Sequence, residues 1–246
     1  MEYCPVRQLP CPIEVCNHIE SLVVLLEDSL GPTRYGVVVT GSLSRGVFQQ
    51  DHSDVDLLVL LNRVPPTPSE EGLGEFLGNV ETTFDITFVT RQQLGTDAWP
   101  TPVVYLGKTA FGIVRKPSGS RDFLLQRQDA FEAGLQVTSG PHVSIRYVPQ
   151  QLIAQCIGHV LPFIRTHFKN RALMLCRVLF WQEYHRLSSK EEAGVLVMDR
   201  VPAQFRSLIS ADLDSYRGNG LRELNDELLG QFEEYVAGVY ARGVPT

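Results

Sequence analysis

The hydrophobic periodicity of this chain changes near residue 149, and that change constrains the fold more than any other feature. Before it, three short runs have the β-branched or alternating pattern of strands: YGVVVTG at 35–41, DVDLLVLLN at 54–62 and TTFDITFVT at 82–90. After it, apolar residues recur only at helical spacing. The sequence therefore predicts an α+β protein, with an α/β domain containing a mixed sheet over residues 1–148 and a helical bundle domain over residues 149–246.

Helices are predicted before, between and after these strands. Residues 13–31 combine helical apolar spacing with a terminal glycine, and residues 70–79 follow a proline-rich loop. A short helix is expected near 44–48 and a longer one over 120–137. The second domain is expected to consist of helices over residues 150–168, 170–187, 189–200, 202–216 and 221–242.

Composition excludes several classes of protein. The formal net charge of −6 argues against a protein that binds nucleic acids or membrane surfaces non-specifically, because such proteins are normally basic. The five cysteines have no CxxC spacing, so neither a zinc site nor a disulfide framework is expected. No apolar run approaches the length of a membrane span, and the first residues do not resemble a signal peptide. We expect a cytoplasmic monomer.

Two aspartates at the entrance of the second predicted strand need a physical explanation. Asp54 and Asp56 are two positions apart, so on a strand both carboxylates point to the same face, roughly 7 Å apart. Like charges at that spacing repel each other, and a cation is expected between them.

The residues just before this pair suggest what the cation accompanies. Gly41 and Ser42 follow the first strand and precede a short helix, where free backbone N–H groups and a hydroxyl can bind phosphate, and Arg45 lies one turn further on. Mg²⁺ prefers carboxylate oxygens completed by substrate phosphates. The segment therefore predicts a site for Mg²⁺ and a nucleoside triphosphate.

A third acidic residue would complete such a site. Asp85 interrupts the third apolar strand, where an isolated carboxylate is costly unless it is paired or coordinated. It can act as a metal ligand or as the base that takes a proton from an attacking hydroxyl. Glu81 shares its face and is the rival candidate, although it lies at the edge of the strand.

This order of elements resembles the nucleotidyltransferase superfamily, whose signature is Gly-Ser, then Asp-x-Asp, then an acidic strand. Eleven residues separate Ser42 from Asp54 here, which is one more than the usual spacing. The second half, from ALMLCRVLFWQEYHRLSSKEE to DSYRGN, resembles the helical domain of the streptomycin/spectinomycin adenylyltransferases. The first domain is therefore expected to be the nucleotidyltransferase domain.

The resemblance implies transfer of AMP from ATP, with magnesium, to a hydroxyl of an antibiotic held between two domains. It implies metal ligation by Asp54 and Asp56, with Asp85 at the position of the family's catalytic glutamate and as a further metal ligand. The ATP contacts that the turn and the resemblance indicate are Gly41, Ser42, Arg45, Ser53, Arg177, Lys190 and Tyr216.

The acceptor side departs from the family. A tryptophan and two aspartates there hold the aminoglycoside, whereas the corresponding positions here are Gly158, Phe163 and His167, flanked by Arg165 and Lys169. A polycationic acceptor would meet repulsion instead of pairing. We therefore expect Phe163 and His167 to contact a small, hydroxylated and less cationic acceptor.

Two other functions fit the same residues. One is a non-catalytic ATP-binding sensor with the same fold. The other is an adenylyltransferase acting on a protein or another acceptor that is not an antibiotic. The complete set of carboxylates favours an enzyme, because a sensor does not need a base.

Overall fold

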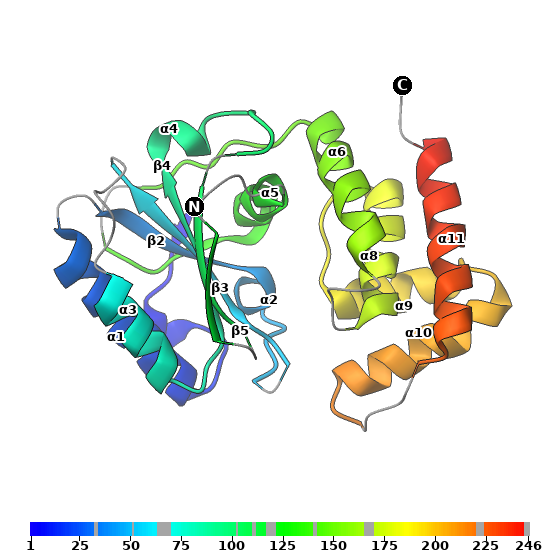
Figure 1. The fold of residues 1–246 in the computed structure, drawn as a ribbon, viewed down its shortest axis with the longest axis horizontal. Coiled ribbons are helices and arrows are strands. Elements are labelled where there is room, and N and C mark those ends of the chain that lie inside the picture. The colour runs from blue at the N-terminus through cyan, green and yellow to red at the C-terminus, as the bar shows by residue number, and fades with distance from the viewer. Residues whose placement is uncertain are drawn as a thin grey trace. The chain divides into compact units, whose positions relative to one another are not determined.

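The computed structural model describes residues 1–31, 34–50, 52–62, 70–101, 103–109, 112–116, 122–139, 142–164, 170–219 and 224–243. The chain divides into two compact units, unit 1 (Met1–Val148) and unit 2 (Pro149–Thr246) (Figure 1). Each unit has its own buried core, and the two are described separately below.

Unit 1 is built around a mixed sheet. Its described strands lie in the order β1-β7-β2-β3-β4-β5-β6, with β3 and β4 parallel and the pairs β2–β3, β4–β5 and β5–β6 antiparallel. The mixed sheet confirms the predicted fold class. The strands are β1 (Glu2–Tyr3), β2 (Arg34–Thr40), β3 (Val55–Leu61), β4 (Phe84–Thr90), β5 (Val104–Thr109), β6 (Gly112–Lys116) and β7 (Leu135–Gln136).

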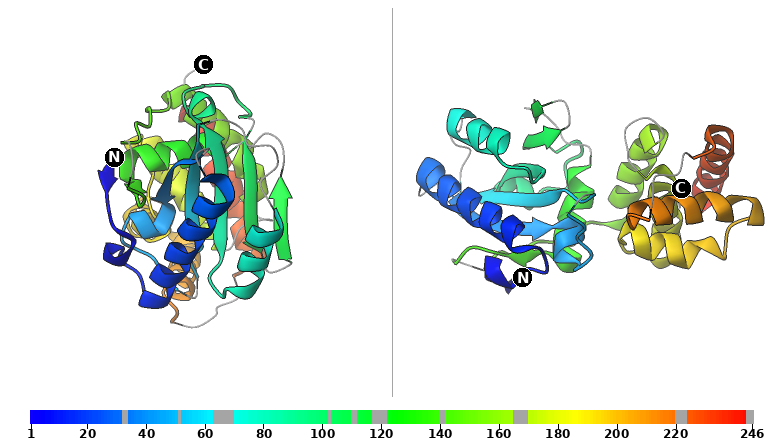
Figure 2. Two further views of the ribbon diagram at one scale, coloured as in Figure 1. Left: turned by 90° about the vertical axis from the view of Figure 1, so that its left-hand side faces the viewer. Right: turned by 90° about the horizontal axis from the view of Figure 1, so that it is seen from below.

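One face of the central strands β2, β3 and β4 is largely apolar, because every second residue points to it. Val37, Val59 and Phe88 are in register on β2, β3 and β4, and all three are buried there. Helices α1 (Ile13–Leu30) and α3 (Glu70–Asn79) pack on this face and lie side by side (Figures 1 and 2). Both helices confirm the sequence prediction, and Gly31 ends α1 in a left-handed conformation (φ 47°).

The opposite face carries the polar residues. Leu58 and Thr87 are register neighbours in its buried middle, and helix α5 (Phe123–Ala133) packs near this side of β2. Figures 1 and 2 show α5 on the other side of the sheet from α1 and α3. The candidate site residues lie at the end of this face.

Two sequence expectations in unit 1 were wrong in their boundaries, and several short elements were not predicted. The short helix after β2 is α2 (Gly41–Ser44), which begins three residues earlier than expected and unwinds at Gly46, where φ is 72°. The predicted helix over 120–137 ends at Ala133, because the chain turns at Gly134 and β7 then joins the sheet. Strands β5 and β6 were not predicted, nor were β1 and the short helices η1 (Val6–Gln8) and α4 (Arg91–Leu94).

Unit 2 contains helices and no strand in its described part, as expected. Aromatic and aliphatic side chains fill its centre, where the rings of Phe205 and Phe232 lie 4.9 Å apart between centroids. No described helix of the chain has the length and apolar character needed to cross a membrane. The elements of unit 2 are α6 (Gln150–Val160), η3 (Leu161–Phe163), α8 (Arg171–Tyr184), α9 (Lys190–Met198), α10 (Ala203–Tyr216) and α11 (Asp226–Gly243).

Candidate nucleotide-binding site

Strand register places two of the three predicted carboxylates side by side. Asp56 on β3 is the Cα partner of Asp85 on the parallel strand β4, and of Thr40 on the antiparallel strand β2. Register partners on neighbouring strands are roughly 4.8 Å apart and point to the same face. Asp56 and Asp85 are both half-buried, so their carboxylates are adjacent and reachable from solvent.

Asp54 differs from this pair. It precedes β3 and is exposed, so it does not share the ladder with Asp56 and Asp85. Among the described residues, no three histidine, cysteine, aspartate or glutamate side chains converge in a way that could hold a metal ion by themselves. Two adjacent carboxylates nevertheless fit Mg²⁺, which usually takes one or two carboxylates and completes its shell with phosphate oxygens and water.

The Gly41 turn passes directly over the Asp56 carboxylate. A Cβ at position 41 would overlap that carboxylate, and Gly41 also has φ of 69°, a conformation that favours glycine. Any other residue at position 41 would force the Asp56 side chain or the turn to move. The turn and Asp56 therefore form one structural site, and its use as a phosphate cradle beside a metal stays a prediction.

Helix α5 holds this turn through two acidic residues that the sequence reasoning missed. The N–H of Gly41 donates to Asp129 Oδ2 at 2.6 Å, and Arg45 Nε donates to Asp129 Oδ1 at 2.8 Å. Arg45 Nη2 also donates to Glu132 Oε2 at 3.1 Å. Burial disfavours the charge of Arg45, but the Asp129 and Glu132 carboxylates outweigh it and raise the arginine's pKa.

Arg45 is therefore already paired with two carboxylates of α5. Its role as an ATP contact stays a prediction, and in the structure its guanidinium links the end of α2 to α5. The sequence signal for Asp129 and Glu132 was weak, since their partners lie 84 to 88 residues earlier in the chain.

Ser53 closes the loop between the turn and β3. Its hydroxyl accepts a hydrogen bond from the N–H of Gln49 at 3.1 Å, and its own N–H donates to the Gln49 carbonyl at 2.7 Å. The hydroxyl proton can still be donated to a ligand. This compact loop accommodates the longer spacing between Ser42 and Asp54.

In unit 2, the structure brings together two of the three predicted ATP contacts. Lys190 is the first residue of α9, and its Nζ lies 5.6 Å from the ring centroid of Tyr216 at the end of α10. Ser189 caps α9 by accepting from the N–H of Glu192 at 3.0 Å. The Glu192 carboxylate pairs with Arg186. Arg177, on α8, is half-buried with Nη1 3.7 Å from Met174 Sδ.

A buried aspartate stabilises this part of unit 2. Asp212 on α10 accepts from the N–H of Leu173 at 3.1 Å and from Asn170 Nδ2 at 3.3 Å. Its burial raises its pKa, while these hydrogen bonds and the charge of Lys190 oppose the rise. Asp212 thereby fastens the start of α8 to α10.

Comparison with known proteins agrees with this two-part organisation. Residues 24–102 match the family model described as a nucleotidyltransferase domain, and residues 146–240 match the model described as the C-terminal domain of aminoglycoside adenylyltransferase. The two matches indicate a nucleotidyltransferase domain followed by a domain similar to the C-terminal domain of aminoglycoside adenylyltransferase.

Individual members of the family are distant from the chain in sequence. It is 24% identical to the aminoglycoside (3'') (9) adenylyltransferases of Shigella flexneri and Escherichia coli, over 92% of this chain and 94% of each relative. A crystal structure of a spectinomycin adenyltransferase, AAD(9), from Enterococcus faecialis with ATP and spectinomycin superposes with a TM-score of 0.74. It is 16% identical, with 92% of this chain and 98% of that chain covered.

The predicted acceptor positions lie only partly within the described residues. Phe163 ends η3, is 44% exposed and has its ring 5.5 Å from that of His159. His167 lies outside the described residues, together with Arg165 and Lys169. At Gly158, one of the predicted acceptor-side positions, the ring of Tyr240 occupies the adjacent space and its hydroxyl donates to the Ala154 carbonyl.

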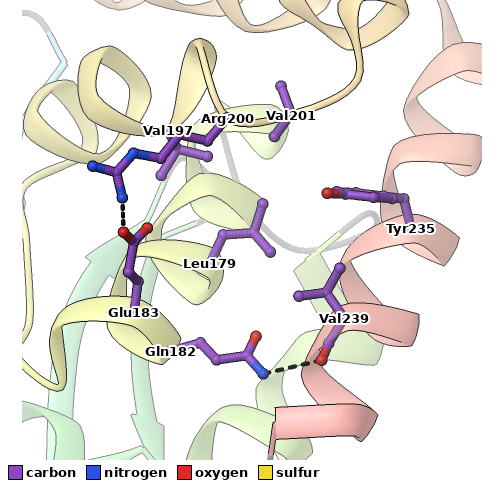
Figure 3. Close-up of a pocket in the computed structure, with 8 residues that line it drawn as sticks. All are labelled: Leu179, Gln182, Glu183, Val197, Arg200, Val201, Tyr235 and Val239. Atoms are coloured by element: carbon purple, nitrogen blue, oxygen red, sulfur yellow. Dashed lines mark hydrogen bonds and ion pairs between the residues drawn. The ribbon is translucent and has the colours of Figure 1, made fainter.

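A separate pocket of about 200 Å³ lies among the helices of unit 2 (Figure 3). Gln182 Nε2 donates to the Val239 carbonyl at its wall, and an ion pair joins Glu183 to Arg200 at its edge. None of the predicted ATP or acceptor residues lines it. Its lining residues are Leu179, Gln182, Glu183, Val197, Arg200, Val201, Tyr235 and Val239.

Proposed function

We propose that this protein transfers AMP from ATP to a hydroxyl of an aminoglycoside or a related small molecule. The observation that carries the proposal is the register of Asp56 and Asp85 beside the Gly41 turn. This arrangement belongs to a chain that matches both family domains and resembles an enzyme solved with ATP and spectinomycin.

The carboxylates have distinct tasks in this proposal. Asp56, together with Asp54 or Asp85, would hold Mg²⁺, which when bound neutralises charge on the phosphates and orients them. Asp85 would accept the proton of the acceptor hydroxyl as its oxygen bonds to the α-phosphorus of ATP, while pyrophosphate leaves with the electrons of the broken bond. Asp85 is one methylene shorter than the family's glutamate, so the proposed proton transfer depends on whether its carboxylate reaches the acceptor hydroxyl.

The remaining residues would bind the nucleotide. Ser42 and Ser53 offer hydroxyl donors next to the Gly41 turn, and Ser53 is already fixed by Gln49. In unit 2, Lys190 and Arg177 supply positive charge for phosphate oxygens, and Tyr216 supports Lys190 through its ring.

For the acceptor, we propose a less cationic molecule than streptomycin. Gly158 and Phe163 stand where the family has a tryptophan and an aspartate, and the exposed ring of Phe163 can stack on a sugar. Streptomycin carries two guanidinium groups, which need carboxylates in a partly desolvated site. Loss of two charge-assisted contacts should weaken its binding by roughly 10²- to 10⁴-fold.

The test is incubation of the purified chain with Mg²⁺ and ATP against an acceptor panel that includes spectinomycin and streptomycin. Mass spectrometry should detect addition of AMP to spectinomycin or another weakly charged acceptor, and little or none to streptomycin. Asp56→Asn should abolish the product while its unfolding midpoint stays the same or rises, since a like-charge contact is relieved. Efficient modification of streptomycin would contradict the proposed acceptor, and ATP binding without any product would favour the sensor.

A further inference from the structure

We propose that Asp129 on α5 is a positioning residue for the nucleotide, acting through the Gly41–Ser42 turn. Each of its carboxylate oxygens accepts from a different part of that turn: Oδ2 from the N–H of Gly41 at 2.6 Å, and Oδ1 from Arg45 Nε at 2.8 Å. The residue is 7% exposed, so these bonds are shielded from competing water. One side chain thus fixes both ends of α2.

Asp129 is itself held by a network within unit 1. Arg45 bridges it to Glu132, whose Oε1 accepts from Gln128 Nε2 at 2.9 Å. Gln128 Oε1 in turn accepts from the N–H of Val148 at 2.9 Å. Because several elements anchor the network, the Asp129 carboxylate keeps its position and thereby determines the position of the turn.

The position of the turn matters because it passes directly over Asp56. Gly41 has positive φ and no room for a Cβ against that carboxylate. A small shift of the turn therefore changes the distance and orientation between the Gly41 backbone and the Asp56 carboxylate. Without Asp129, the Gly41 N–H loses its acceptor and Arg45 keeps only Glu132. The turn would then have to be ordered by the nucleotide, which costs affinity.

This role differs from a direct contact with ATP. The Asp129 carboxylate is negatively charged, and its two oxygens already contact the Gly41 N–H and the Arg45 guanidinium. It would therefore repel a phosphate instead of binding it. It acts by preparing the backbone before the nucleotide arrives. The inference rests on the proposed use of the Gly41 turn for ATP, but it does not depend on which acceptor is modified.

The experiment compares four proteins: the unaltered chain, Asp129→Ala, Asp129→Asn and Asp97→Asn. Asp97, which follows α4, pairs with Arg127 of α5 at 2.7 Å, so Asp97→Asn also removes a carboxylate partner of α5 and is the matched control. Three quantities are measured for each: hydrogen exchange of the Gly41 amide without nucleotide, the Kd for Mg–ATP by calorimetry, and the free energy of unfolding in urea. Asp129→Asn keeps the size of the side chain and one acceptor oxygen if Asp129→Ala does not fold.

We expect Gly41 exchange to accelerate and the Kd for Mg–ATP to rise about tenfold or more in Asp129→Ala, with a smaller rise in Asp129→Asn. Asp97→Asn should lose stability while its Kd stays within about twofold of the unaltered chain. Unchanged Gly41 exchange in the Asp129 variants, unchanged ATP affinity, or an equal loss of affinity in Asp97→Asn would overturn the positioning role. A chain that binds Mg–ATP as expected but transfers no AMP would contradict only the proposed function.

Discussion

Asp85 and Asp56 are adjacent carboxylates, yet only one of them can be the proton acceptor. Asp85 is the better candidate because β4 has no other acidic residue and the family places its base there. We expect Asp85→Asn to lower turnover by about 100-fold or more while ATP binding is mostly retained. Calorimetry and initial rates distinguish this from loss of a metal ligand, which would remove ATP binding as well.

Asp85→Glu is the matching control. It restores the family's side chain and adds one methylene of reach, so activity should stay within about tenfold of the unaltered chain if the pocket accepts either length. A Glu variant as inactive as Asp85→Asn would show that the shorter side chain is required by its surroundings.

Thr40, the other register partner of Asp56, has a buried hydroxyl without a hydrogen-bond partner in the described part of the chain. A buried polar atom in that state costs stability, and valine has nearly the same shape. We expect Thr40→Val to raise the free energy of unfolding by about 1 kcal/mol, measured by urea denaturation. A clear loss of stability would show that the hydroxyl has a partner, such as an internal water.

At the scale of elements, prediction was best where one local signal decided the structure. Periodicity and a terminal glycine located α1, and α3 has the bounds that its pattern indicated. Strands β5 and β6 are short, contain glycine and lysine, and exist because they pair with β4 and with each other. Such pairing is a property of the tertiary structure, which a single run of residues does not reveal.

In the candidate site, too, residues with a local sequence signal were predicted, and contacts that depend on the tertiary structure were not. The Gly-Ser turn and the acidic strand residues were visible in sequence because each breaks a local pattern. The Asp129 and Glu132 contacts were not, since they depend on α5 reaching α2 across the fold. Lys190 and Tyr216 were each predicted as ATP contacts through the resemblance, and their 5.6 Å approach to one another is a result of how α9 meets α10.

Helix α9 begins with a lysine, which is unfavourable next to the positive end of the helix dipole. Tyr216 and the charge of Asp212 offset this cost, so Lys190→Gln should change the free energy of unfolding by less than about 0.5 kcal/mol. ATP affinity should nevertheless fall about tenfold, since a phosphate-binding charge is lost. Arg206→Gln removes an exposed positive charge from α10 and is the control; an equal loss of affinity there would indicate a non-specific charge effect.

On the scale of the whole molecule, the proposed ATP contacts are divided between the two units. Gly41, Ser42 and Ser53 belong to unit 1, and Lys190 and Tyr216 to unit 2. Each unit has a core of its own, so a substitution in one set should leave the fold of the other unit intact. Variants from both sets that weaken ATP binding without a common loss of stability would support contact with the same nucleotide.

The overall charge leads to a prediction about metal. The chain has a net charge of −6, and the proposed phosphate site has Asp56 and Asp85 beside it, so metal-free ATP should be repelled. Mg–ATP at about 100 times its Kd should stabilise the fold by about 2.7 kcal/mol, a rise in melting temperature of roughly 5–10 °C. ATP with EDTA should give little or no rise.

Two variants test whether the carboxylates are responsible. In Asp56→Asn, Mg–ATP should raise the melting temperature less, and the melting temperatures with Mg–ATP and with ATP plus EDTA should lie closer together. Asp28→Asn, on the exposed side of α1, should behave as the unaltered chain. Equal stabilisation by ATP with and without Mg²⁺ would exclude the carboxylate pair as a metal site.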